Sequence, residues 1–178
     1  MTVREVEMKL GARNDNNNYM KKIVLAIIAA VAMTASCCGP KDGEYTFRLL
    51  TTNDVHGRYF DSLYVTDRTN NALTNVAWYA DSVRVAEGAE NVILIDAGDC
   101  LQGDNAAYYY NYVDTTSKHL FARMVEYAGY DAVVVGNHDI ETGHPVYDRL
   151  IETMKVPFLA ANAIRTDNGK PYFQEYVT

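Results

Sequence analysis

The feature that most constrains the fold of this chain is an alternation of short β-forming runs with segments of helical spacing. The β-forming runs cover residues 45–52, 91–95, 131–135 and 156–161. The segments between them repeat apolar residues every three or four positions, and they lie in 69–87, 120–128 and 145–154. The order βαβαβαβ predicts an α/β fold with a mostly parallel sheet and right-handed crossovers. Because the apolar runs are unbroken, we expect both faces of the strands to be covered.

Glycine and proline mark the ends of the expected helices. Gly88 and Gly129 follow the first two helical segments, where a glycine commonly stops a helix. Pro145 opens the third segment at a position that suits the first turn of a helix. These residues set the predicted boundaries.

The composition excludes several classes of protein. With 178 residues, 48% hydrophobic and 22% charged, the chain is typical of globular proteins and not of long disordered ones. Its formal net charge of −7 argues against binding to the phosphate backbone of DNA or RNA, which needs clustered lysine and arginine. A phosphate handled by such an acidic protein therefore calls for a metal ion.

Residues 20–36 have the organisation of an export signal. Two lysines precede an apolar run over 23–33, and small residues follow it. Eleven residues of helix reach about 16 Å, roughly half of a hydrocarbon core, so a signal is favoured over a permanent spanning helix. The small residue before Cys37 resembles the lipobox of bacterial lipoproteins, which implies cleavage before Cys37 and lipidation of its thiol. Cys38 is a shifted alternative.

The signal divides the chain into four parts. Residues 1–19 are interpreted as a mis-called start or a disordered prefix, 20–36 as the lipoprotein signal peptide, and 37–44 as a tether. Residues 45–178 then form one domain, exported and anchored to a membrane on its periplasmic or cell-surface side. Residues 37–178 carry a net charge of −9, and Cys100 is expected to be a small buried side chain and not half of a disulfide.

Polar clusters follow the first three predicted strands directly. They read TNDVHGR over 52–58, DAGDCLQG over 96–103 and GNHDIE over 136–141. Because ligands bind at the carboxyl ends of the strands of an open α/β sheet, these distant segments are expected to meet in one place. We expect Asp96, which ends the second strand, to support the ligands and not to be one.

The side chains in these clusters suit divalent metal chemistry. Carboxylates, an imidazole and an asparagine carbonyl form a set that binds Mn²⁺, Fe, Zn²⁺ or Mg²⁺, and no pair of thiolates is present to build a structural zinc site. Two ions bridged by one carboxylate can generate hydroxide near neutral pH and clamp a phosphoryl group. Asp99 is the candidate bridge.

The series D-x-H, G-D and G-N-H-[DE] resembles that of the calcineurin-like metallophosphoesterases. The three full clusters resemble the exported branch, the 5'-nucleotidase / 2',3'-cyclic-nucleotide phosphodiesterase family, over residues 45–178. The resemblance implies that this chain forms the N-terminal half of an αββα sandwich. It also implies hydrolysis of nucleotides or other phosphomonoesters, in which a metal-bridging hydroxide attacks phosphorus.

The resemblance assigns roles to particular residues. Asp54 and His56 would hold the first of two divalent ions (Mn, Zn, Fe, Co or Mg), Asp99 would bridge, and Asn137 would hold the second. His138 would be the catalytic histidine. The family usually places an aspartate three residues after it as a hydrogen-bonding partner, and this chain has Glu141 there.

The resemblance also implies parts that this chain does not contain. The family completes its metal sites with three further histidines, usually including a Gly-His-x-His segment, and adds a nucleotide-binding domain. We therefore expect a fragment with little activity alone, and a half-built sheet with an exposed apolar face. The alternative is a lipoprotein remnant that binds a metal or phosphate without catalysis. A third interpretation, that the clusters are only caps and turns, does not explain a histidine in two of the three loops.

Several other residues are interpreted structurally. His119 and His144 precede or open predicted helices, so we expect them to be solvated or to cap those helices. The tyrosines of 108–112 are expected to cover a surface or an interface, although they could stack against a nucleobase.

Overall fold

The computed structural model describes residues 21–24, 43, 45–62 and 71–178. The chain divides into two units, residues 1–45 and 46–178. In the first unit residues 21–24 are helical. The predicted prefix, most of the signal peptide and the lipidation site at Cys37 lie outside the described residues. Within the described part of the chain, no helix has the length and apolar character needed to cross a membrane.

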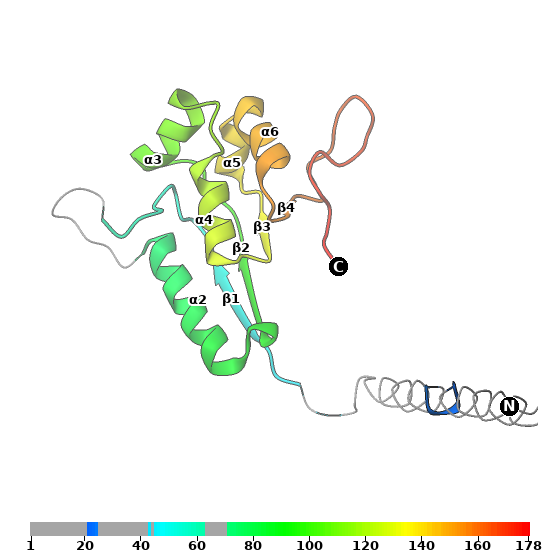
Figure 1. Ribbon diagram of the computed structural model, residues 1–178. Coiled ribbons are helices and arrows are strands. Elements are labelled where there is room, and N and C mark those ends of the chain that lie inside the picture. Colours follow the sequence, from blue (N-terminus) through cyan, green and yellow to red (C-terminus); the bar gives the residue numbers. More distant parts are fainter. Residues whose placement is uncertain (1–20, 25–42, 44, 63–70) are drawn as a thin grey trace, which may run out of the picture. The chain divides into compact units, whose positions relative to one another are not determined.

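The second unit is built on a four-stranded sheet (Figure 1). Its strands are β1 (Arg48–Thr52), β2 (Val92–Asp96), β3 (Ala132–Val134) and β4 (Phe158–Leu159), which are adjacent in that order. Every neighbouring pair is parallel. Each predicted β-forming run overlaps one of these strands, which confirms the parallel α/β fold.

Three longer helices connect the strands. They are α2 (Leu73–Glu87), α4 (Leu120–Ala128) and α6 (His144–Thr153). Gly88 and Gly129 end the first two with positive φ angles of 89° and 68°, and Pro145 lies in the first turn of α6, as predicted. The sequence did not indicate α3 (Asn105–Tyr108), the π-helical turn that continues it (Tyr109–Val113), the 3-10 turn (Ala89–Asn91) or α5 (Asn137–Glu141).

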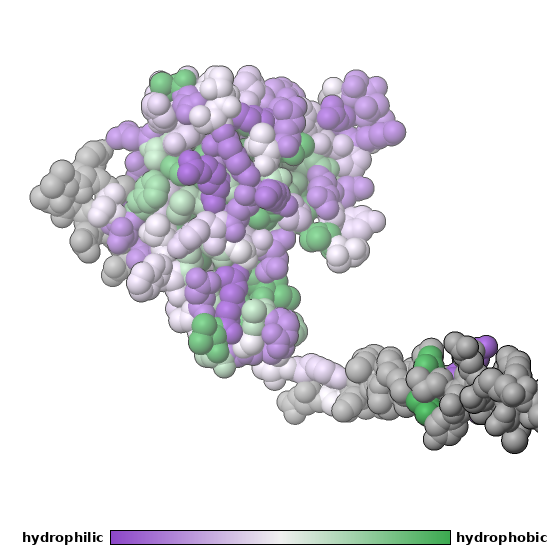
Figure 2. All heavy atoms as spheres, viewed as in Figure 1, coloured by the Kyte–Doolittle hydropathy of each residue, from purple (hydrophilic) through white to green (hydrophobic). Residues whose placement is uncertain are grey.

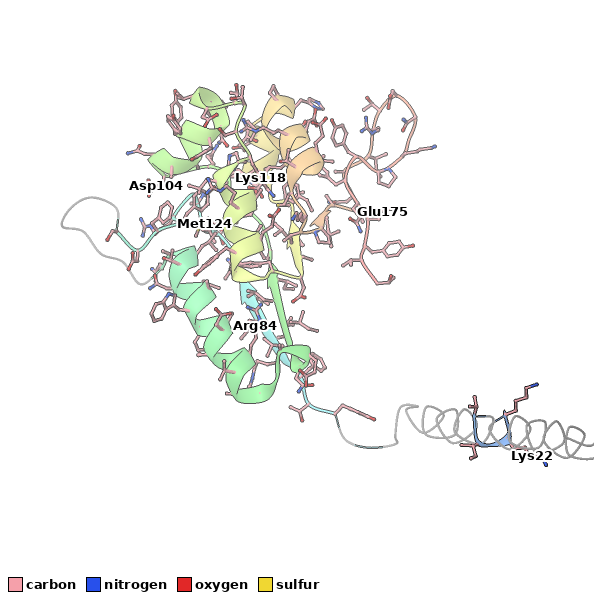
Figure 3. All side chains as sticks on the ribbon, in the orientation of Figure 1. Lys22, Arg84, Asp104, Lys118, Met124 and Glu175 are labelled. Carbon is pink, nitrogen blue, oxygen red and sulfur yellow. The ribbon has the colours of Figure 1, made fainter. Side chains whose placement is uncertain are left out.

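Helices α2 and α4 pack against each other, and one arginine of α2 completes the end of α4. The guanidinium of Arg84 donates to the carbonyls of Ala128 at 2.8 Å and Gly129 at 2.6 Å. Those carbonyls have no partner inside the helix, so Arg84, labelled in Figure 3, satisfies them from the neighbouring helix.

The hydrophobic core lies on one face of the sheet. Leu94 of β2 and Val133 of β3 are fully buried and belong to the same cluster as Phe121 and Val125 of α4 and Leu150 of α6. Alternate residues of a strand point to opposite faces, so this cluster accounts for only one side.

The other face of the sheet carries exposed apolar side chains. Leu49 is 51% exposed, Ile93 39% and Val134 40%. Leu49 and Ile93 are register partners and therefore neighbours on this face. Figure 2 shows hydrophobic residues at the surface in the region of α2 and β1. Among the described residues this face is not covered, so the expectation that both faces of the strands are covered is wrong there, whereas the expected exposed apolar face is observed.

Candidate active site

Three loops follow β1, β2 and β3 at the carboxyl edge of the sheet. We call residues 53–58 the first loop, 97–104 the second and 135–136 the third, which leads into α5. The second loop lies beside the first, because three of its consecutive carbonyls accept from first-loop amides: Asp54 N to Gly98 O (3.0 Å), His56 N to Asp99 O (2.9 Å) and Gly57 N to Cys100 O (3.0 Å). Asp104, labelled in Figure 3, returns a bond from its amide to the carbonyl of His56 at 3.0 Å. The expected meeting of the clusters is thus observed.

Three residues of these loops have an unusual backbone conformation. Asp54, His56 and Asp99 have φ angles of 53°, 49° and 63°, and in the described part of the chain no other residue except glycine has a positive φ. Such a conformation costs a non-glycine residue roughly 1–3 kcal/mol and persists only where surrounding bonds enforce it. Strain of this kind gathers at functional sites, and here it falls on three of the four predicted metal ligands.

The side chains of the first loop are arranged as a pair of ligands. The Nε2 atom of His56 lies 3.7 Å from the Oδ1 atom of Asp54. The Nδ1 atom of His56 lies 3.1 Å from the carbonyl of Gln102, which accepts a hydrogen bond from it and leaves Nε2 as the ring nitrogen that faces the carboxylate. Asn53 donates from its amide to the other oxygen of Asp54.

Two glycines allow the second and third loops to touch. A Cβ built on Gly136 would lie 2.2 Å from Oδ1 and 2.4 Å from the amide nitrogen of Asp99, and one on Gly98 would lie 2.6 Å from the amide nitrogen of Gly136. The contact lets the amide of His138 donate to Oδ1 of Asp99 at 2.9 Å. The predicted bridging ligand and the predicted catalytic histidine are therefore directly connected.

His138 and Glu141 form the pair that the motif predicts. The Nδ1 atom of His138 lies 2.9 Å from Oε2 of Glu141, which also accepts from the side chain of Gln102 at 3.3 Å. This hydrogen bond raises the pKa of His138 and lowers the pKa of Glu141. The imidazole ring of His138 faces that of His56, with 5.3 Å between the ring centroids. The side chain of Glu141 therefore reaches His138 from the position where the resembled family usually has an aspartate.

The predicted ligands do not form a complete metal centre among the described residues. No group of three or more His, Cys, Asp and Glu side chains there is placed to hold an ion. Asp54 and His56 form a close pair, one oxygen of Asp99 already accepts from a backbone amide, and Asn137 begins α5 with an exposed side chain. The donor types fit a divalent cation, and the Asp54–His56 pair fits two ligands of one ion.

Asp96 supports the second loop from below. It is fully buried, and it accepts from Thr52 Oγ1 at 2.5 Å, from Gly98 N at 2.8 Å and from Cys100 Sγ at 3.1 Å. Burial raises the pKa of its carboxyl group. The placement agrees with a supporting role and not a ligand role, and Cys100 is buried as predicted.

Asp139 belongs to the third motif, but the motif did not predict a role for it. It is the fourth letter of GNHD, and its buried carboxylate accepts four backbone hydrogen bonds, described further below. The sequence signal was available, because an acidic residue at the third position of a helix is typical of a capping box.

His119 has one of the two roles expected for it, the capping role, and has it in a buried position. It caps α4 as expected, since its Nδ1 accepts from Phe121 N at 3.1 Å, but it is fully buried and not solvated. Its Nε2 pairs with Asn111 at 2.9 Å, and Asn111 in turn donates to Leu101 O at 2.7 Å. Asn111 belongs to the π-helical turn and Leu101 to the second loop, so these hydrogen bonds connect the turn to that loop. His144 is 66% exposed, as expected.

The tyrosines of the π-helical turn and α3 lie at the surface. Tyr108, Tyr109 and Tyr112 are 59%, 48% and 51% exposed. The rings of Tyr108 and Tyr112 meet edge to face at 5.3 Å. The surface interpretation holds for these three tyrosines, whereas Tyr110 is half-buried and packs against the core.

Comparison with known proteins agrees with this geometry. No protein-family model matches the chain. It is 26% identical over 164 residues to the 2',3'-cyclic-nucleotide 2'-phosphodiesterase/3'-nucleotidase of Yersinia enterocolitica, covering 89% of this chain and 24% of that protein. It is 32% identical over 128 residues to the 5'-nucleotidase of Bos taurus, covering 69% and 21%. Its structure is similar to that of the calcineurin-like phosphoesterase YfkN from Bacillus subtilis, with a TM-score of 0.63, 26% identity, and 74% and 41% of the two chains covered.

The fold matches that of the N-terminal part of calcineurin-like phosphoesterase domains. The chain is a homologue of 5'-nucleotidases and of a 2',3'-cyclic-nucleotide phosphodiesterase. It spans about a quarter of the length of the curated relatives that it matches.

Proposed function

We propose that this chain provides the N-terminal part of the catalytic domain of a nucleotide phosphoester hydrolase that uses two divalent metal ions. The observation that carries the proposal is the coincidence of backbone strain with ligand chemistry at Asp54, His56 and Asp99. Nucleotide substrates are proposed because the relatives named above act on nucleotides.

The proposed ligands divide between two ions. Asp54 and His56 would hold the first, Asp99 would bridge, and Asn137 would contribute its amide oxygen to the second. When bound, the ions would polarise the phosphoryl oxygens and lower the pKa of water. The remaining ligands would come from segments outside this chain.

His138 would hold and deliver a proton. Its Nδ1 faces Glu141, and this hydrogen bond raises the pKa of the imidazole, which favours the protonated form. The Nε2 proton is then available to stabilise charge on the phosphoryl group or to protonate the leaving oxygen. Glu141 would act by orienting the ring and fixing its tautomer.

A chimera tests the proposal. Residues 45–178 would replace the matching segment of the Yersinia relative, and hydrolysis of 3'-AMP, 5'-AMP and 2',3'-cyclic AMP would be measured with Mn²⁺. We expect hydrolysis of at least one substrate, reduced at least 100-fold by Asp99→Asn. Asp131→Asn is the matched control, because Asp131 accepts one backbone bond at the other edge of the sheet. A folded chimera that binds Mn²⁺ without turnover, or that keeps its activity after Asp99→Asn, would contradict the proposal.

One observation favours a second candidate. Because no complete metal centre is found among the described residues, the chain could serve as a lipoprotein that binds a metal ion or phosphate without catalysis. The same chimera separates the two, since a binding protein would retain Mn²⁺ and give no product.

We also propose export and lipidation at Cys37, which the lipobox-like sequence supports. The expected result is incorporation of labelled palmitate into the expressed chain and its loss in Cys37→Ala. Full labelling of Cys37→Ala together with none of Cys38→Ala would move the site to Cys38. Absence of labelling in the unaltered chain would end the proposal of an anchor.

A further inference from the structure

The carboxylate of Asp139 collects four backbone amides at the centre of the site. Its Oδ2 atom accepts from Asp99 N at 3.0 Å and Gly136 N at 2.8 Å, and its Oδ1 atom accepts from Cys100 N at 2.9 Å and Leu101 N at 2.8 Å. The residue is 1% exposed, and in the described part of the chain no lysine, arginine or histidine forms an ion pair with it.

Helix capping accounts for only one of these bonds. The bond from Gly136 is the ordinary capping contact of α5. The other three come from the second loop, 38 to 40 residues earlier in the sequence. Asp139 therefore joins two loops, which a simple cap does not require.

A carboxylate suits this position, because each of its two oxygens accepts two of the four hydrogen bonds. Four N–H groups point at it and none of them can accept, so the side chain must offer four acceptor positions and no donor. An asparagine would turn an NH₂ group toward two amide donors. The choice of aspartate is thus explained by geometry.

The second loop is held from both sides. Its carbonyls at residues 98–100 accept from the first loop, and its amides at residues 99–101 donate to Asp139. The positive φ of Asp99 lies inside this doubly bonded segment, and the amides of Asp54 and His56 donate to its outer side. Release of the inner side would remove the bonds that oppose the strain at Asp99.

We propose that Asp139 is a positioning residue that holds the second loop in its strained conformation and so fixes Asp54, His56 and Asp99 as metal ligands. The inference rests on the proposed function, because it assumes that these three residues bind a metal ion.

The test measures backbone protection in the whole chain and metal affinity in the chimera described above, which supplies the remaining ligands. Amide hydrogen exchange is followed by NMR at Asp99, Cys100, Leu101 and Gly136, and Mn²⁺ binding by the loss of its free EPR signal. For Asp139→Asn we expect exchange at least tenfold faster at these four amides and Mn²⁺ affinity at least tenfold weaker. Asp139→Ala, which removes the misplaced NH₂ group, should give the same result and serves if the asparagine variant does not fold.

Asp131→Asn is the matched control. Asp131 accepts from Leu94 N at 2.8 Å, and the amide oxygen of an asparagine can still accept that single bond, so both exchange at the four amides and Mn²⁺ affinity should stay within twofold. Faster exchange with unchanged Mn²⁺ affinity in the Asp139 variants would overturn the proposal, and so would unchanged exchange. Unfolding of both variants beside a folded control would make Asp139 a folding residue and also overturn it. If the unaltered chimera takes up no Mn²⁺, the proposed function fails, and the positioning role fails with it for that separate reason.

Discussion

At the scale of single residues, three positions of the site have a backbone conformation that residues other than glycine normally avoid. The three ligand candidates with positive φ pay a local cost that only their neighbours can offset. The contact between Gly98 and Gly136 provides the space in which those neighbours meet. Because both requirements concern the backbone, a substitution beside the ligands can damage the site as much as removal of a ligand.

Gly136→Ala should be strongly destabilising for steric reasons alone. Gly136 has a φ of −87°, which any residue adopts, but its added methyl group would overlap the carboxylate and amide of Asp99. We expect a loss of about 3 kcal/mol in the free energy of unfolding, measured with urea. Gly169→Ala is the control, because its φ is +68° with no atom within 4 Å, and backbone strain alone should cost it about 1 kcal/mol. Equal losses would show that the loops separate easily.

The sequence predicted which residues lie in the site better than it predicted the contacts that those residues make. The motifs located the three loops and the His138–Glu141 pair, because those side chains lie close to one another in sequence or follow strands directly. The role of Asp139 could not be derived from its own segment, since three of its four partners belong to another loop. Likewise, nothing in the local sequence shows that Asn111 comes to lie against His119.

At the scale of elements, the spacing of apolar residues predicted the helices that are long enough to complete two turns. Helices α2, α4 and α6 have nine or more residues and each ends or begins at the expected glycine or proline. Helix α5 has five residues and α3 has four, so neither completes two turns of apolar spacing. These short helices carry or flank the site, so the least predictable elements are the ones closest to the chemistry.

The buried cap of α4 predicts a pH-dependent stability. Burial lowers the pKa of His119 to about 3, so the folded protein binds a proton there less readily than the unfolded chain, whose histidine has a pKa of about 6.5. The contribution of neutral His119 is complete above pH 6.5 and falls by about 1.4 kcal/mol per unit as the pH drops toward 3.

Comparison with His119→Gln isolates this contribution. The difference in unfolding free energy between the original chain and the variant should shrink by about 2 kcal/mol between pH 7 and pH 5. Urea titrations at several pH values would measure it. The exposed His144, replaced by Gln, controls for the removal of a histidine as such. A difference that stays constant with pH would contradict a buried neutral His119.

At the scale of the whole molecule, the described domain is one-sided. Parallel strands ordinarily have both faces covered, and the unbroken apolar runs of this chain carry that pattern. In the structure only one face has a core, whereas Leu49, Ile93 and Val134 remain exposed on the other. The sequence pattern therefore predicts strands that are suited to burial on both faces. It does not show which segments cover each face.

Two adjacent residues of β2 test this asymmetry. Leu94 is fully buried and Ile93 is 39% exposed, although they belong to the same strand. Leu94→Ala should lower the unfolding free energy by about 3 kcal/mol, and Ile93→Ala by less than about 1 kcal/mol. Urea denaturation at low protein concentration is the measurement. Equal costs would mean that the second face is covered in solution.

The doubly bonded second loop has a kinetic consequence. Backbone hydrogen bonds hold the loops that carry Asp54, His56 and Asp99, so a cation that binds at the proposed site would call for rotation of exposed side chains such as Asp54 and not for rearrangement of the backbone. Uptake should then proceed in a single step, as fast as the ion sheds its own water, with no slow rearrangement of the protein behind it.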